Sequence, residues 1–184
     1  MSLRPPRTCN SSAADVIALY SQLERLGIEI WIDGGWGVDT LLGNQTRPHE
    51  DIDIVIQQHQ AGDLRKFLED KGYRDVPREN TSAWNFVMGD ESGHLVDFHV
   101  INFDQHGNGL NGPIEKEGVY PAESVTGTGT INGHLVRCIT AQWMVNFHSG
   151  YELDQDDYQD VSSLCEKFNI PLPAEYLRFQ SPGS

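Results

Sequence analysis

Three aspartates have the types and the spacing of a metal-dependent active site. Asp51 and Asp53 stand two apart in an alternating segment, so a strand would carry both carboxylates on one face, roughly 6.6 Å apart along the chain. Asp97 lies in a later alternating segment and would project a third carboxylate from a sheet. Three carboxylates around two Mg²⁺ ions suit in-line displacement at phosphorus, because the metals lower the pKa of the attacking oxygen and stabilise the charge on the leaving group.

A pair of glycines, Gly34 and Gly35, precedes these acids between a strand and the start of a helix, where bare backbone N–H groups could approach a triphosphate. Each signal alone has an ordinary alternative. Two acids on a strand often form an exposed edge, and a Gly-Gly pair is often only a turn. The order of the signals raises the case for a phosphate-handling site: strand, glycines, short helix, acid pair, isolated acid.

The elements that must position these residues follow from hydrophobic periodicity and turn residues. Helices are expected over residues 12–26, 36–42, 140–149 and 156–168, with another that ends at Gly72. Strands are expected over residues 28–32, 51–56, 83–88, 94–101, 125–131 and 134–139, and residues 102–124 are expected to be mostly loop. This order predicts one α+β domain over residues 1–184, with a mixed sheet and flanking helices in a core of about 12–139 and a helical C-terminal portion of about 140–179.

The composition narrows the class of partner. Thirteen Lys and Arg against 27 Asp and Glu give a formal charge of −14. This excess argues against nucleic-acid and anionic-membrane partners, which need a positive field, and it favours a small cationic ligand. No apolar run is long enough to span a membrane, and the N-terminus lacks the apolar stretch of a secretory signal, so a cytoplasmic protein is expected. Cys9, Cys138 and Cys165 lack the spacing of a zinc site or disulfide framework, and Cys138 and Cys165 are expected to be reduced residues in or near the core.

Two adjoining segments, residues 30–43 and 45–54, closely resemble the antibiotic nucleotidyltransferases of the DNA polymerase β superfamily. Within that superfamily the chain is most similar to the small lincosamide nucleotidyltransferases and next to the aminoglycoside 2''-nucleotidyltransferases. Residues 95–99 and 147–153 resemble the lincosamide branch. The resemblance implies a nucleotidyltransferase fold and transfer of AMP from Mg·ATP, or of GMP from GTP, to a hydroxyl of a drug. It also makes a homodimer a reasonable expectation.

The resemblance also implies roles for individual residues. Asp51 and Asp53 match the metal-binding pair, and Asp97 matches the third carboxylate, which activates the acceptor hydroxyl. Gly34, Gly35 and Trp36 fall where the family holds the nucleotide phosphates. The wider superfamily usually has Ser where this chain has Trp36, so a hydroxyl that touches phosphate elsewhere is missing here.

Arg47 and His99 each have two interpretations. The Arg47 guanidinium could contact phosphate, since it forks onto two oxygens, or it could form an ion pair with Asp39 or Glu50. His99 shares a strand face with Asp97 and could line the acceptor pocket, or it could be an ordinary hydrogen-bonded sheet histidine.

The C-terminal segment offers candidates for drug binding. His148 and Tyr151 could help to build the antibiotic pocket, or they could fix the junction of two helices. Five acids follow without an intervening base, and they could form a negative lip for a drug amine or simply favour a helix N-terminus: Glu152, Asp154, Asp156, Asp157 and Asp160.

Two other functions compete with lincosamide modification. An aminoglycoside 2''-nucleotidyltransferase would suit the charge of −14, because those drugs carry several positive charges. A catalytically silent nucleotide-binding or antitoxin-like module could keep the fold without the reaction. Against that module, all three carboxylates of the pattern are present.

Overall fold

The computed structural model describes residues 11–112 and 118–180, so Cys9 lies outside the described residues. The helices are α1 (Ala13–Arg25), α2 (Gly34–Leu42), α3 (Gln58–Asp70), α4 (Ala141–Phe147) and α5 (Gln155–Phe168), with 3-10 helical segments at Ala122–Thr126 and Ala174–Phe179. The strands are β1 (Ile30–Ile32), β2 (Ile52–Gln57), β3 (Arg74–Val76), β4 (Asn85–Gly89), β5 (Leu95–Phe103), β6 (Gly109–Asn111), β7 (Gly118–Tyr120), β8 (Gly127–Ile131) and β9 (His134–Cys138).

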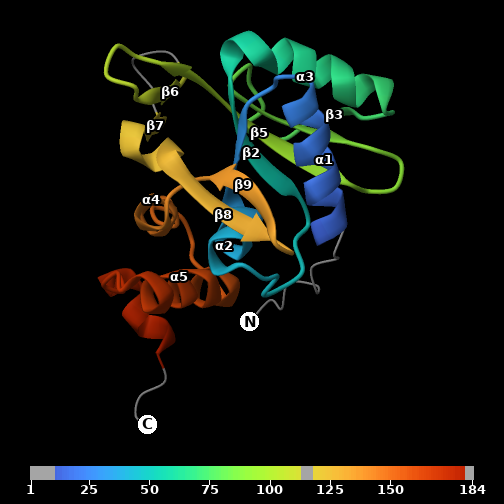
Figure 1. Cartoon of the computed structure of the whole chain (residues 1–184). Helices are drawn as coiled ribbons and strands as arrows, with labels where there is room; N and C mark the ends of the chain where they lie inside the picture. The colour runs from blue at the N-terminus through green and yellow to red at the C-terminus, as the bar shows by residue number, and fades with distance from the viewer. Residues whose placement is uncertain (1–10, 113–117, 181–184) are drawn as a thin grey trace.

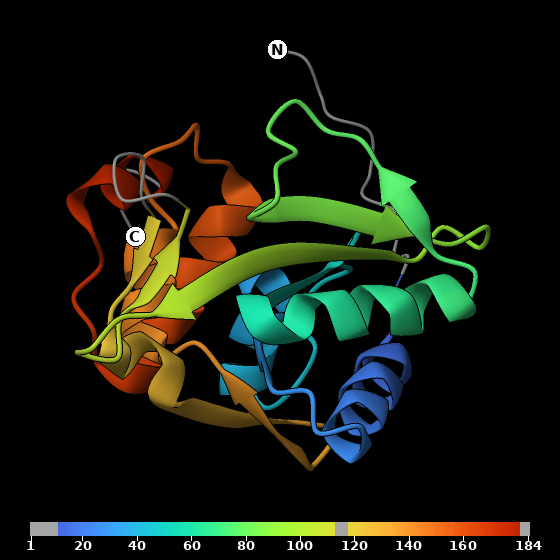
Figure 2. The same ribbon diagram turned by 90° about the horizontal axis from the view of Figure 1, so that it is seen from above.

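The strands form one mixed sheet in the order β3-β4-β5-β2-β1-β9-β8, and β6 and β7 extend from the end of β5. In Figure 1, α1 and α3 lie at the upper right, whereas α2, α4 and α5 gather at the lower left. Figure 2 shows α3 running along β5, with α1 beside it. The α+β architecture with a helical C-terminal portion is as predicted from the sequence.

Helix α1 starts where its capping residues predict. The Ser12 hydroxyl accepts from the backbone N–H of Asp15, and the Asp15 carboxylate accepts from the backbone N–H of Ser12 at 2.7 Å. This reciprocal pair satisfies two N–H groups that a helix leaves unpaired at its start. The helix then buries Val16, Tyr20 and Leu23 against the sheet.

Helix α2 begins earlier than predicted. Its N-cap is Asp33, and the two glycines form its first residues, whereas the sequence pattern placed the start at Trp36. The Asp33 side chain accepts from the Gly34 N–H at 2.8 Å, and the Asp33 carbonyl accepts from the Gly37 N–H at 2.8 Å. The glycines therefore belong to the first turn of α2 and not to a separate loop. They follow the end of β1 after the single residue Asp33.

The β4–β5 and β8–β9 hairpins are confirmed. Strand β4 pairs antiparallel with β5, and β8 pairs antiparallel with β9 through the turn at Asn132 and Gly133. Both turn residues have positive φ, 48° and 79°, as a two-residue hairpin with the right twist requires. Cys138 and Cys165 are free and buried, in agreement with the prediction of reduced core residues.

Three short strands were missed. Residues 102–124 hold β6, β7 and a 3-10 segment instead of being mostly loop, although residues 113–117 lie outside the described part. Strand β3 was also missed. Each of these strands has three residues, too few for two full periods of alternation, so periodicity gives no signal.

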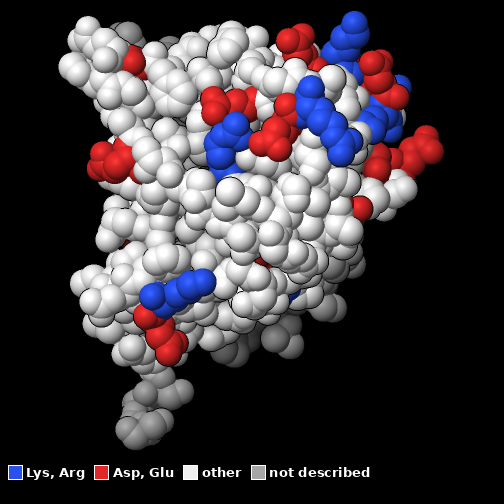
Figure 3. Space-filling model, viewed as in Figure 1, with Lys and Arg blue, Asp and Glu red and all other residues white. Residues whose placement is uncertain are grey.

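The charge of the protein is not spread evenly. Figure 3 shows acidic and basic side chains intermixed over the upper part of one face, around α3, above a largely uncharged surface. This face therefore presents no continuous acidic field. Among the described residues, no helix has both the length and the apolar character needed to cross a membrane.

Candidate active site

Parallel pairing of β2 with β5 brings the predicted acids together. Asp53 and Asp97 are directly paired in this register, although they lie 44 positions apart in the sequence. One ligand atom each from Asp53, Asp97 and His99 lies within 4.8 Å of the others. Asp51 sits immediately before β2 and contributes its charge from the edge of this group. The strands thus build a carboxylate cluster from the residues that the sequence pattern selected.

The cluster holds more negative charge than its surroundings favour. Burial raises the pKa of Asp51 to about 7, and the charges of Asp53 and Asp97 add to that rise. Burial also raises the pKa of Asp97 to about 6, against the opposing charge of His99. Crowded, partly buried carboxylates are the oxygen ligands that Mg²⁺ prefers, and a divalent cation would relieve their repulsion. The donor set therefore fits a hard divalent metal.

His99 balances part of this charge. Burial lowers the pKa of the imidazole, but the hydrogen bond and charge of Asp53, with the charges of Asp33 and Asp97, outweigh it and raise the pKa to about 9. Its Nδ1–H donates to Oδ1 of Asn85 at 3.1 Å, and its Nε2 lies 3.7 Å from Oδ1 of Asp53. His99 is thus an internal cation beside the acids, and it is also the hydrogen-bonded sheet histidine of the alternative interpretation.

Gly34 and Gly35 lie so close to neighbouring side chains that no larger residue fits at either position. Gly34 has a φ of +54°, and a Cβ built on it would meet the carboxylate of Asp53. A Cβ on Gly35 would meet the imidazole of His49, with Nη2 of Arg47 at 2.9 Å. The first turn of α2 therefore lies directly against the acids, where its backbone N–H groups can face a phosphate bound to them.

Replacement of Gly34 by Ala is expected to lower transfer about 100-fold, because the new methyl group displaces Asp53 from its metal-binding position. Gly27→Ala is the matched control, since Gly27 has a φ of +73° but no atom within 4 Å of its Cβ position. Steady-state kinetics and thermal melting of both variants separate backbone strain from displacement of the acid. Equal losses of activity in the two variants would show that close packing on Asp53 is unimportant.

The side chain of Trp36 is buried in the core. Its side chain is 1% exposed, and its indole N–H donates to the hydroxyl of Ser11 at 3.0 Å. The ring packs on His49, whose Nε2 bonds with Asp39. Asp39 also accepts from the hydroxyl and N–H of Thr46. Any contact of residue 36 with a nucleotide would thus be through its backbone, while its side chain anchors α2.

Arg47 makes its ion pair with neither Asp39 nor Glu50. Its Nη2 donates to Oδ2 of Asp160 at 2.7 Å, and its Nε lies 3.1 and 3.2 Å from the two carboxylate oxygens. Both side chains are largely buried, with exposed fractions of 13% and 1%. The pair joins the loop before β2 to α5, so Asp160 is not part of an acidic lip. The sequence could not identify this partner, because it lies 113 positions away.

The C-terminal candidates make contacts within their own lobe. The His148 ring bonds with the Met144 carbonyl at 2.7 Å, and the Tyr176 hydroxyl donates to the His148 carbonyl at 2.6 Å. The Tyr151 hydroxyl donates to Asp157 at 3.0 Å. Asp157 in turn forms a capping box with Asp154 at the start of α5. These contacts match the interpretation of helix-junction residues and helix-start acids.

Tyr120 and Asp33 are site residues that the sequence reasoning missed. The Tyr120 hydroxyl donates to Oδ2 of Asp33 at 3.0 Å, and burial together with the Asp33 charge raises the pKa of Tyr120 well above its ordinary value. Tyr120 also packs edge-on against Phe147 of α4. The only available signal was the position of Asp33 directly before the glycines, where an Asp is a typical N-cap.

Arg78, Asn85 and Asn111 complete the surroundings of His99 and were also missed. Asn85 receives the His99 bond, and the Asn111 amide lies 3.3 Å from the same Asn85 oxygen. Arg78 lines a cavity of about 30 Å³ together with Asp97 and His99. Asn85 lies in the strand predicted over residues 83–88, whereas Arg78 lies in the β3–β4 connection and Asn111 in β6, which the sequence pattern did not predict.

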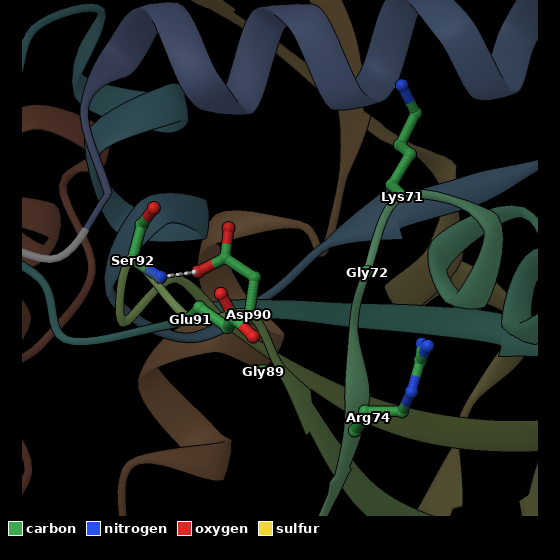
Figure 4. Close-up of a pocket in the computed structure, with 7 residues that line it drawn as sticks. All are labelled: Lys71, Gly72, Arg74, Gly89, Asp90, Glu91 and Ser92. Carbon is green, nitrogen blue, oxygen red and sulfur yellow. Dashed lines mark hydrogen bonds between the residues drawn. The ribbon is translucent and has the colours of Figure 1, made fainter.

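A larger hollow of about 560 Å³ lies at the turn that joins β4 to β5. Figure 4 shows Lys71 and Arg74 on one side of it and Asp90, which accepts from the Ser92 N–H, on the other. Its lining residues include none of the predicted site residues: Lys71, Gly72, Arg74, Gly89, Asp90, Glu91 and Ser92. The carboxylate cluster remains the candidate active site.

Known proteins resemble this chain over most of its length. The sequence model of the aminoglycoside-2''-adenylyltransferase family matches residues 15–164. A lincosamide resistance protein from Staphylococcus haemolyticus is 30% identical over 156 residues, which cover 84% of this chain and 95% of that protein. A 2''-aminoglycoside nucleotidyltransferase from Klebsiella pneumoniae is 38% identical over 73 residues, which cover 40% of this chain and 41% of that one.

Solved structures of antibiotic nucleotidyltransferases share the fold of this chain. The lincomycin-bound crystal structure of the lincosamide antibiotic adenylyltransferase LnuA matches with a TM-score of 0.74 and 28% identity over 88% of this chain and 99% of that one. The complex of ANT(2'')-Ia with adenylyl-2''-tobramycin matches with a TM-score of 0.67 over 91% and 92% of the two chains, and at 19% identity it bears on the fold alone. The predicted nucleotidyltransferase fold is confirmed, and the chain belongs to the aminoglycoside-2''-adenylyltransferase family.

Proposed function

We propose that this protein transfers AMP from Mg·ATP to a hydroxyl of a lincosamide antibiotic, with release of pyrophosphate, and so inactivates the drug in the cytoplasm. The observation that carries the proposal is the β2–β5 register, which sets Asp97 beside Asp53 with the first turn of α2 packed on Asp53. The likeness to a lincosamide resistance protein along 84% of the chain supports the choice of acceptor.

The residues divide the reaction between them. Asp51, Asp53 and Asp97 would hold Mg²⁺, which when bound neutralises phosphate charge and lowers the pKa of the attacking oxygen. Asp97 accepts the proton of the drug hydroxyl, because its carboxylate lies beside Asp53 in the same cluster. The hydroxyl oxygen forms the new bond to the α-phosphorus while the bond from that phosphorus to the bridging oxygen breaks. The first turn of α2 directs backbone N–H groups at the phosphates.

Aminoglycoside 2''-adenylylation is the second candidate. The description of the matching family and the 38% identity over 73 residues to an aminoglycoside enzyme favour it. The lincosamide relative matches about twice as much of the chain, 84% against 40%. We therefore give the lincosamide precedence.

Incubation of the protein with Mg²⁺ and a panel of lincosamides and aminoglycosides, with ATP or GTP in separate arms, tests the proposal. Mass spectrometry is expected to find a monophosphate adduct of the lincosamide with ATP. An adduct on aminoglycosides alone would transfer the assignment to the second candidate. Intact nucleotide binding with no adduct on any drug would favour an unknown acceptor or a catalytically silent module.

A further inference from the structure

Arg78 is a cationic residue close to the carboxylates of Asp51 and Asp97. It is exposed, and within residues 11–112 and 118–180 its guanidinium has no hydrogen bond or ion pair. Its backbone is nevertheless fixed, because its N–H donates to the Thr81 hydroxyl at 2.7 Å and its carbonyl accepts from the Thr81 N–H at 3.1 Å. The connection from β3 to β4 thus presents a free cation from an ordered turn. Arg47, in contrast, is occupied by Asp160.

Arg78 borders the candidate active site. Arg78, Asp97 and His99 line the same cavity of about 30 Å³, which has room for a group about the size of one water molecule. The positive charge of Arg78 also acts on the carboxylates of Asp51 and Asp97. Figure 2 shows the β3–β4 connection bending away from the sheet and returning at the start of β4.

The strand order places Arg78 opposite the nucleotide side of the site. The first turn of α2 packs against Asp53 and follows β1, which pairs with β2. Strand β4 pairs with β5 on the other side of Asp97. In-line displacement puts the attacking and leaving oxygens on opposite sides of the phosphorus. If pyrophosphate leaves on the α2 side, the acceptor enters beside Asp97 and Arg78.

We propose that Arg78 is a specificity-determining residue of the acceptor site. It selects acceptors that carry uncharged oxygens, such as amide carbonyls and hydroxyls, next to the reacting hydroxyl. A guanidinium donates hydrogen bonds to such oxygens, and it repels an ammonium group at the same position. The single amine of a lincosamide would then lie away from Arg78, whereas an aminoglycoside would bring several ammonium groups to the site. This inference rests on the proposed function.

The test compares Arg78→Glu with Arg74→Glu. Arg74 is an exposed arginine of β3 that lines the separate hollow of Figure 4, so it controls for the general effect of charge reversal. Calorimetry measures the Kd of lincomycin and of tobramycin without nucleotide. Arg78→Glu is expected to weaken lincomycin binding about tenfold, the effect of losing charge-assisted hydrogen bonds, and to strengthen tobramycin binding. Arg74→Glu is expected to leave the ratio of the two Kd values unchanged, and the KM for ATP is expected to stay the same in both variants.

The outcomes separate this inference from the proposed function. An equal Kd ratio in Arg78→Glu and Arg74→Glu, in a wild-type protein that adenylates lincomycin, would overturn the role of Arg78 alone. A raised KM for ATP in Arg78→Glu with unchanged drug binding would place Arg78 on the nucleotide side and would also overturn it. Failure of the wild-type protein to bind either drug would contradict both proposals.

Discussion

Asp97→Asn is expected to bind ATP and Mg²⁺ and to lose transfer by about 10³- to 10⁴-fold, because the amide cannot take the proton of the acceptor hydroxyl. The amide keeps the shape of the carboxylate. Asp97 takes part in only one of the six residue pairs between β2 and β5, so the substitution is expected to leave the strand pairing intact. Single-turnover transfer to lincomycin gives the rate, and equilibrium titration gives nucleotide affinity. Loss of the transfer rate with unchanged nucleotide affinity distinguishes a catalytic base from a residue that only stabilises the fold.

Asp63→Asn serves as the control for Asp97→Asn. Asp63 is exposed on α3, on an element that contributes no residue to the carboxylate cluster. Its substitution removes the same charge from the protein and is expected to leave the transfer rate unchanged. Near wild-type transfer by Asp97→Asn would mean that another group takes the proton.

Breaking the Arg47–Asp160 pair is expected to destabilise the protein by about 3–5 kcal/mol, because the remaining partner is left charged and buried. Asp160→Asn and Arg47→Met each remove one partner. Urea unfolding at a fixed pH measures the free energy of unfolding, and the double variant is expected to recover part of the loss. Burial raises the pKa of Asp160, and the hydrogen bond and charge of Arg47 oppose that rise, so loss of Arg47 is expected to raise this pKa further.

Asp75→Asn is the matched control for this pair. Asp75 binds Arg65 on the surface, where its side chain is 63% exposed, and its loss is expected to cost less than about 1 kcal/mol. If Arg47→Met kept its stability but lost affinity for ATP, Arg47 would be a phosphate contact, as the resemblance suggested, and its pairing with Asp160 would be of little energetic importance.

The elements with two or more periods of alternation or full capping signals were predictable. Helix α1 has both its capping box and an apolar stripe, and β2 and β5 alternate along most of their length. The start of α2 was predicted too late, because glycine is a poor helix former and only the N-cap Asp33 signals the true start. The strands β3, β6 and β7 pair with neighbouring strands of the chain, but three residues are too few to show an alternating pattern.

The candidate site was predictable in its acids and not in its surroundings. Asp53 and Asp97 follow from strand patterns, and the family resemblance pairs them. Tyr120 and Arg78 reach the site from a short hairpin and a turn, so their approach depends on tertiary packing and on no local pattern. The partner of Arg47 was hidden for the same reason, since a guanidinium before β2 has many acids available along the chain.

The register that aligns Asp53 with Asp97 also limits where this chain tolerates a change of length. Side chains on a strand alternate with a period of two, so gain or loss of one residue inside β2 or β5 would turn the following acid into the core. The connection at residues 77–84 carries no such alternation. Insertions and deletions in descendants of this chain are therefore expected to accumulate there, while β2 and β5 drift only by substitution. Evolution can thus remodel the edge of the site without disturbing the carboxylates.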